Sequence, residues 1–197
     1  MKPIIGIISR NYYSETNKKI NIVYDDLYKA ILKSGGIPIG IPQNENIKNY
    51  LPIINGIILQ GGDDINKHNL KTIKILLEKN IPTLGICLGM QEMFFDNNLI
   101  DISNHYQNSL HEININKNSI LYNIIKREKI LVNSRHKSAI KDTKYNISSK
   151  SKDNIIESIE IPNHKFFIGL QWHPENLYSI DKNSKKIFDY FIKICKN

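Results

Sequence analysis

Short apolar runs alternate with helical patterns through the first half of the chain. Continuous apolar segments predict buried strands at residues 3–9, 37–42, 56–60 and 82–86. Apolar residues at helical spacing predict helices at residues 21–33, 70–79 and 88–97. Strands that are apolar throughout and alternate with helices are typical of a parallel sheet covered on both faces. The pattern therefore predicts an α/β fold with a mostly parallel central sheet.

The second half of the chain has a different pattern. Short strand-like runs separated by turns occupy residues 109–115, 130–133, 145–148 and 155–161. They predict a small antiparallel extension of the sheet. A further apolar strand at residues 166–171 and a closing helix at residues 184–195 complete the pattern. The sequence contains no repeat and no linker rich in Pro, Gly or Ser, so we expect residues 1–197 to form one domain.

The segment Gly85-Ile86-Cys87-Leu88-Gly89 stands where a predicted strand passes into a predicted helix. A tight turn there needs small residues two positions before and two after its apex, and both are glycine. A nucleophile elbow has this arrangement, here with a thiol at the apex. The adjacent helix N-terminus favours the reactive thiolate. A lone cysteine is more often an inert core residue, so the assignment depends on a base.

His173 is the candidate base, and it follows the last predicted strand. In an open parallel sheet, ligands bind and catalytic residues lie just beyond the carboxyl ends of the strands. Cys87 and His173 both lie at such ends, so we expect them to meet. Glu175, two residues further, could hold the imidazole tautomer that accepts the thiol proton. The other histidines outside the motifs have no comparable context, and we expect surface positions for His68, His105 and His164.

The pair Gly61-Gly62 ends the strand expected beside the elbow strand. Glycine lets backbone N–H groups approach a substrate carbonyl. Together with the amide of Leu88, this backbone could form an oxyanion hole. An ordinary strand-ending turn is the alternative reading of Gly-Gly-Asp-Asp.

Composition and charge limit the kinds of molecule that this protein is expected to bind. The chain has 197 residues, a formal net charge of +8 and two cysteines, Cys87 and Cys195. Its lysines are scattered and no nucleic-acid motif accompanies them, so we expect no nucleic-acid partner. No apolar stretch is long enough for a membrane span or a signal peptide.

Two distant cysteines form no disulfide framework, which favours a reducing, cytoplasmic setting. The histidine and cysteine spacings match no metal site, and no phosphate loop or dinucleotide fingerprint is present, so we expect no metal and no cofactor.

Six motifs in order resemble those of a known superfamily, the class I glutamine amidotransferase-like proteins. Within it, the chain is similar to the gamma-glutamyl hydrolase family (peptidase family C26), which includes the gamma-glutamyl-gamma-aminobutyrate hydrolases. The motifs are residues 3–7, 59–64, 85–91, 110–113, 132–136 and 171–175. The resemblance implies a flavodoxin-like three-layer sandwich.

The resemblance also implies roles for particular residues. Cys87 matches the nucleophile, which would form a gamma-glutamyl thioester, His173 the general base and acid, and Glu175 the third member of the triad. Gly62 and Leu88 match the oxyanion-hole donors. The residues that match positions near the glutamyl end of the substrate are Gln91, Asn133, Ser134, Arg135 and His136. The chain departs from many hydrolases of the family at Leu88, where they have arginine, and in a shorter stretch after Gly62.

These observations predict a cysteine-dependent hydrolase that cleaves the amide of a small gamma-glutamyl amine and releases glutamate. We expect an amine of the gamma-aminobutyrate or polyamine type, and an ethanolamine-like amine and a nucleotide-linked amidate also remain open. The alternative is a glutaminase subunit that delivers ammonia to a partner synthase. Such subunits usually have phenylalanine where this chain has Trp172, which favours the hydrolase. A non-catalytic binding protein is a third reading, against which the intact triad argues. The sequence does not fix the oligomeric state, and a homodimer is one of the states it allows.

Overall fold

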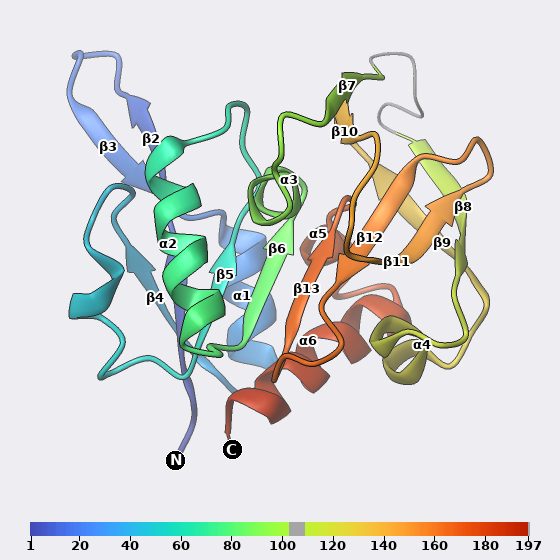
Figure 1. Cartoon of the computed structure of the whole chain (residues 1–197). Helices are drawn as coiled ribbons and strands as arrows, with labels where there is room; N and C mark the ends of the chain where they lie inside the picture. The colour runs from blue at the N-terminus through green and yellow to red at the C-terminus, as the bar shows by residue number, and fades with distance from the viewer. Residues whose placement is uncertain (103–108, 197) are drawn as a thin grey trace.

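A nine-stranded sheet forms the centre of the molecule (Figure 1). The computed structural model describes residues 1–102 and 109–196 of the chain. Across the sheet the strands follow the order β4-β1-β5-β6-β13-β12-β11-β8-β9. They are β1 (Ile4–Ile8), β4 (Ile37–Ile41), β5 (Gly56–Leu59), β6 (Thr83–Ile86), β8 (Ser109–Ile115), β9 (Lys129–Ser134), β11 (Asn146–Ser151), β12 (Ile156–Glu160) and β13 (Phe167–Leu170).

The first five strands in this order pair in parallel, and the other four join them in antiparallel pairs. Numbered along the chain, the parallel strands are arranged 2-1-3-4-5, which is the flavodoxin-like order. The predicted α/β class with a mostly parallel sheet is confirmed. The predicted antiparallel extension is also present and contributes four strands.

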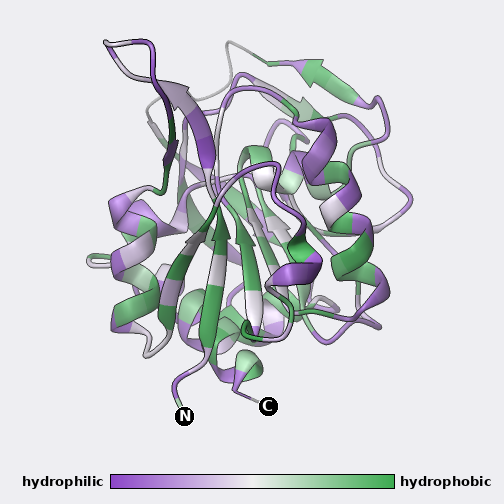
Figure 2. Ribbon diagram, turned by 90° about the vertical axis from the view of Figure 1, so that its left-hand side faces the viewer, coloured by the Kyte–Doolittle hydropathy of each residue, from purple (hydrophilic) through white to green (hydrophobic). Residues whose placement is uncertain are grey.

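Helices cover both faces of the sheet, which gives three layers (Figure 1). One face carries α1 (Asp25–Lys33), α4 (Ile120–Ile125), α5 (Pro174–Leu177) and α6 (Lys182–Cys195), and the other carries α2 (Lys67–Glu78) and α3 (Leu88–Met93). Strand residues alternate between the two apolar layers: Ile58 packs in the layer of α1 and α6, and its neighbours Ile57 and Leu59 in the layer of α2 and α3. Figure 2 shows the green, hydrophobic strands between helices whose outer sides are purple.

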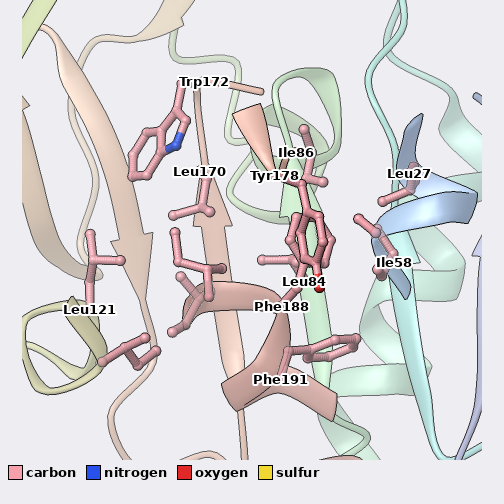
Figure 3. Close-up of a cluster of buried hydrophobic side chains, with 14 of the residues drawn as sticks. Leu27, Ile58, Leu84, Ile86, Leu121, Leu170, Trp172, Tyr178, Phe188 and Phe191 are labelled. Carbon is pink, nitrogen blue, oxygen red and sulfur yellow. The ribbon is translucent and has the colours of Figure 1, made fainter. Parts of the chain in front are cut away.

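Aromatic side chains fill much of the layer beneath α6. In Figure 3, Phe188 and Phe191 of α6 lie beside Leu84 of β6, and Trp172 lies beyond the end of β13. Each of these four side chains is almost fully buried. Among the described residues, no helix combines the length and apolar character that crossing a membrane requires.

The segment from residue 10 to residue 24 differs from the predicted pattern. Residues 10–22 form a hairpin of β2 (Arg10–Tyr13) and β3 (Lys19–Ile22), so the predicted helix over residues 21–33 begins only at Asp25. The side chain of Gln60 explains the late start. Its Nε2 donates to the carbonyl of Ile22 and its Oε1 accepts from the amide of Tyr24, at 2.8 and 3.1 Å. These bonds hold the segment extended against its helical pattern.

Other short elements carry too little pattern to be predicted. The elbow helix α3 ends at Met93, four residues before the predicted end, and the next segment leads to β7 (Leu99–Asp101). That strand pairs with β10 (Ser138–Ile140), in a small separate sheet. Helices α4 and α5 were likewise absent from the predicted elements, and each has only four to six residues.

The corner between β6 and α3 is tightly packed around two glycines. An added Cβ at Gly85 would lie 2.8 Å from the backbone of Gly89 and would also press on Met93. An added Cβ at Gly89 would collide with the carbonyl oxygen of Leu59, at the end of the neighbouring strand. Glycine is therefore required at positions 85 and 89, because any side chain there would collide with backbone atoms that cannot move aside.

Gly89→Ala should destabilise the protein by about 3 kcal/mol, because overpacking against backbone forces the helix off the sheet. Gly40→Ala is the matched control. The methyl group it adds would lie 3.3 Å from a side-chain atom of Val23, which can move. Urea denaturation followed by circular dichroism measures both changes. A loss for Gly89→Ala no larger than the loss for Gly40→Ala would contradict the packing argument.

Candidate active site

Cys87 lies at the apex of the corner, between the last residue of β6 and the first residue of α3. Its backbone has φ 53° and ψ −110°, a conformation that non-glycine residues rarely adopt and that clusters at functional sites. The amide of Cys87 donates to the carbonyl of Leu170 at 2.7 Å, which ties the corner to β13. Leu88 begins the helix, so its N–H lacks a partner within the helix. The corner therefore presents a thiol beside an available backbone donor.

His173 and Glu175 follow β13, the parallel neighbour of β6. The Nδ1 atom of His173 lies 2.7 Å from Oε1 of Glu175. Pro174 occupies the first position of α5 and fixes the turn between the two residues. The strand order thus brings together three residues from segments more than 80 positions apart, and the carboxylate orients the imidazole.

The pKa of His173 reflects three influences. Burial lowers the pKa. Hydrogen bonds with Cys87 and Glu175, together with the charges of these two groups, raise it by more than burial lowers it, and the net result is a pKa of about 10. His173 is therefore protonated near neutral pH. The imidazolium lies within hydrogen-bonding reach of the Cys87 side chain. The arrangement can supply a nucleophile and a proton donor at the same time.

The backbone at Gly61 and Gly62 closes the opposite side of the site. An added Cβ at Gly61 would lie 2.9 Å from Cε1 of His173, so the glycine leaves room for the imidazole. Within the described part of the chain, neither the Gly62 amide nor the Leu88 amide has a protein acceptor. Both donors are thus available to an oxygen atom beside Cys87, as an oxyanion hole requires.

A pocket of about 420 Å³ opens in front of these groups. It is lined by Tyr24, Asp25, Asp26, Gly61, Gly62, Asp63, Cys87, Arg135, His173, Glu175 and Asn176. The volume is in the range of small-molecule sites. Three aspartates and one arginine face it, so the pocket offers both signs of charge with carboxylates in excess.

Of the five residues matched to the glutamyl end, Arg135 lines the pocket. Asn133 instead clamps the backbone of His173: its Oδ1 accepts from the His173 amide at 2.9 Å and its Nδ2 donates to the His173 carbonyl at 3.1 Å. Both residues come from the end of β9, the far edge of the sheet. The antiparallel strands therefore curl back to the site that the parallel strands build.

The other three residues of this set are buried behind the pocket. They are Gln91, Ser134 and His136. The Nε2 atom of Gln91 donates to the Ser138 carbonyl at 2.7 Å and to Oε1 of Gln171 at 3.1 Å. His136 approaches the same carbonyl through Nδ1 at 3.2 Å. Their contact with substrate stays a prediction, since the structure places them in a supporting layer.

Gln171, the first residue of the motif at residues 171–175, is a residue of the site that the sequence did not predict. Its Nε2 lies 3.7 Å from the Sγ atom of Cys87, where it can donate to a thiolate. The aspartates, Tyr24 and Asn176 of the pocket were also not predicted. Tyr24, Asp25 and Asp26 stand at the start of α1, at the end of the connection that leaves the carboxyl end of β1, and this is the one signal that could have marked them.

Two further expectations concern histidines and metals. His68 and His164 are half-buried rather than fully exposed, and His105 lies outside the described residues. Among residues 1–102 and 109–196, no group of three histidine, cysteine, aspartate or glutamate side chains is placed to hold a metal ion.

Comparison with known proteins identifies the family of this chain. The sequence matches the Peptidase C26 family over residues 3–73 and 66–175. The chain belongs to this family. Among its relatives, the glutamine amidotransferase-like protein YvdE of Lactococcus lactis is 30% identical over 92% of this chain and 89% of that protein. The gamma-glutamyl-gamma-aminobutyrate hydrolase PuuD of Escherichia coli is 24% identical over 99% of this chain and 94% of that protein.

The fold has relatives outside the close family. The glutaminase domain of Trypanosoma brucei CTPS superposes with a TM-score of 0.73 at 16% identity, covering 98% of this chain and 94% of that domain. The alignment with PuuD spans 242 positions, more than the 197 residues of this chain. This peptidase C26 protein therefore lacks internal segments that the relative has.

Iodoacetamide should modify Cys87 and spare Cys195. Burial raises the pKa of Cys195 to about 12, so its thiolate is scarce near neutral pH. Cys87 opens into the pocket beside the His173 imidazolium. Mass spectrometry should find one modified cysteine in the native protein and in Cys195→Ala, and none in Cys87→Ser. Comparable modification of Cys195 in the folded protein would overturn this expectation.

The pKa of His173 should respond to both of its neighbours. Glu175→Gln should lower it because a carboxylate favours the imidazolium, and Cys87→Ala should lower it because a hydrogen bond is lost. In the double variant only burial remains, and the pKa should fall below its ordinary value of 6.5. NMR titration of the imidazole measures all four proteins. A double variant that titrates above 6.5 would show that another group charges the ring.

Proposed function

We propose that this protein hydrolyses the amide bond of small gamma-glutamyl amines and releases glutamate. The observation that carries the proposal is the cysteine at the corner, 7% exposed, facing a histidine that a carboxylate orients at 2.7 Å. Membership of the peptidase C26 family supports a hydrolase of the class I glutamine amidotransferase-like type. The name of the relative PuuD supports a gamma-glutamyl amide as the substrate.

In the proposed reaction, the Cys87 thiolate attacks the gamma-carbonyl carbon. A carbon–sulfur bond forms and the carbonyl electron pair moves onto oxygen, where the Gly62 and Leu88 amides stabilise the negative charge. His173 gives its proton to the amine nitrogen as the carbon–nitrogen bond breaks, and a thioester remains. Water then attacks the thioester while His173 takes its proton. Glutamate leaves and the thiolate and imidazolium are restored.

The charges around the pocket suggest how the substrate is held. A gamma-glutamyl group ends in an ammonium and a carboxylate on one carbon. Arg135 can pair with the carboxylate, and one aspartate with the ammonium. Asp26 already accepts from Asn176 Nδ2 at 3.0 Å, and Asp25 pairs with Lys29, so Asp63 is the carboxylate most free to bind a ligand.

The excess of carboxylates favours an amine that is itself cationic. The polyamine type carries a second ammonium, whereas gamma-aminobutyrate carries a carboxylate. Two unit charges about 4 Å apart interact by about 1 kcal/mol in water, which is roughly a fivefold change in affinity. Between the two substrate types considered, the pocket therefore favours the polyamine type.

The test uses the purified protein alone. We expect turnover of gamma-glutamylputrescine, with kcat/KM at least about fivefold above that for gamma-glutamyl-gamma-aminobutyrate, from the charge argument above. Mass spectrometry detects glutamate and the released amine. Cys87→Ser should abolish turnover while Cys195→Ser retains it. If the protein turned over glutamine but no gamma-glutamyl amine, or were active only after a synthase was added, the result would support the glutaminase alternative.

The basis of the preference has its own control within the same assay. Asp26→Asn should reduce the ratio of the two kcat/KM values, because it removes a pocket carboxylate other than Asp63, which pairs with the glutamyl ammonium common to both substrates. Asp96→Asn removes a carboxylate outside the pocket and should leave the ratio unchanged. A ratio that Asp26→Asn does not alter would show that the amine is chosen by shape rather than charge.

A further inference from the structure

A buried ion pair joins Arg10, just after β1, to Glu92 of α3. Arg10 is 5% exposed and Glu92 is 1% exposed. The Nη1 and Nη2 atoms of Arg10 lie 3.0 and 3.1 Å from the two carboxylate oxygens. Glu92 also accepts from the amide of Asn66 and from Nδ2 of Asn69, at 3.0 Å each. The carboxylate is therefore held on several sides, and it holds the guanidinium in one orientation.

The same guanidinium binds the backbone that ends β5. Its Nε donates to the carbonyl of Gly61 at 3.0 Å, and its Nη2 donates to the carbonyl of Gln60 at 2.5 Å. In a planar trans peptide the C=O and the N–H point in opposite directions. The carbonyl of Gly61 and the N–H of Gly62 belong to one such peptide. A side chain that holds this oxygen also sets the direction of the Gly62 N–H.

Arg10 and Cys87 line two different hollows that meet at Gly62. The pocket with Cys87 is lined by Gly61 and Gly62, and Arg10 instead lines a second hollow of about 250 Å³, which also includes Gly62. An added Cβ at Gly62 would lie 2.8 Å from Nε of Arg10 and 3.0 Å from Cδ2 of Leu88. With the Gly61 carbonyl held by Arg10, the Gly62 N–H points away from the guanidinium.

We propose that Arg10, fixed by Glu92, is a positioning residue that directs the Gly62 amide toward the oxygen that develops at Cys87. The guanidinium also polarises the peptide through its carbonyl, which strengthens the N–H as a donor. A buried ion pair contributes little net stability, so stability alone gives no reason for this pair. The inference rests on the proposed hydrolysis and names the device that prepares its oxyanion hole.

The experiment removes the pair without leaving one charge buried. Arg10→Met combined with Glu92→Leu, called the apolar pair, replaces both side chains by apolar ones of similar size. Arg10→Lys keeps the positive charge but loses the planar set of N–H donors that binds the carboxylate and the backbone carbonyls together. The control removes the exposed pair Lys129–Glu112, on β9 and β8, by glutamine at both positions. Three readouts are compared: kcat and KM for gamma-glutamylputrescine, the rate of Cys87 alkylation by iodoacetamide, and the Gly62 amide signal in NMR spectra.

We expect kcat of the apolar pair to fall about 100-fold, the effect of losing one oxyanion donor, with KM within about threefold. Alkylation forms no oxyanion, so its rate should stay within about twofold of wild type. The Gly62 signal should shift, Arg10→Lys should be intermediate, and the control should match wild type. The inference is overturned if the apolar pair keeps kcat, or if its alkylation rate falls in parallel with kcat.

The two proposals fail in different ways. A wild-type protein that turns over no gamma-glutamyl amine contradicts the proposed function, whatever the variants do. A Gly62 amide signal that is unchanged in the apolar pair contradicts the role of Arg10, whether or not turnover is found. The NMR readout therefore tests the positioning role without any substrate.

Discussion

Close backbone contact at one corner is the constraint on which the site depends. Gly89 of α3 lies against the carbonyl of Leu59 at the end of β5, and Gly85 of β6 lies against Gly89. These contacts press the first turn of the helix onto two neighbouring strands. Cys87, between the two glycines, has no room for ordinary strand or helix geometry and takes φ 53°. The position of the sulfur at the pocket thus follows from close packing around two residues that have no side chain.

Polar groups behind the pocket complete what the corner begins. Gln171 reaches the sulfur, and Gln91 holds Gln171 from behind. On the other side, Arg10 and Glu92 hold the backbone at Gly61. Such groups are expensive to bury unless their hydrogen bonds are satisfied. Each wall of the site therefore has a rigid hydrogen-bonded layer that limits how far its reacting groups can move.

Much of the fold could be predicted from the sequence because its central strands are apolar throughout and end at glycine or polar residues. The strands, the corner at Cys87 and the placement of His173 beside it follow from local pattern and from the rule on carboxyl ends. The hairpin of β2 and β3 could not be predicted, because Gln60 imposes it from 36 to 38 residues away. The role of Arg10 could not be predicted for the same reason: its partners lie just after β5 and on α3, and only the folded sheet brings them together.

The role of Asn133 illustrates how the two halves of the sheet are linked. The edge strand β9 lies four strands from β13, yet Asn133 holds the backbone of His173 by two hydrogen bonds. Edge strands open more readily than central ones. A transient detachment of β9 would release the imidazole and withdraw Arg135 from the pocket while the parallel strands stay folded. Thermal inactivation of this protein can therefore begin as a local event, well before the core melts.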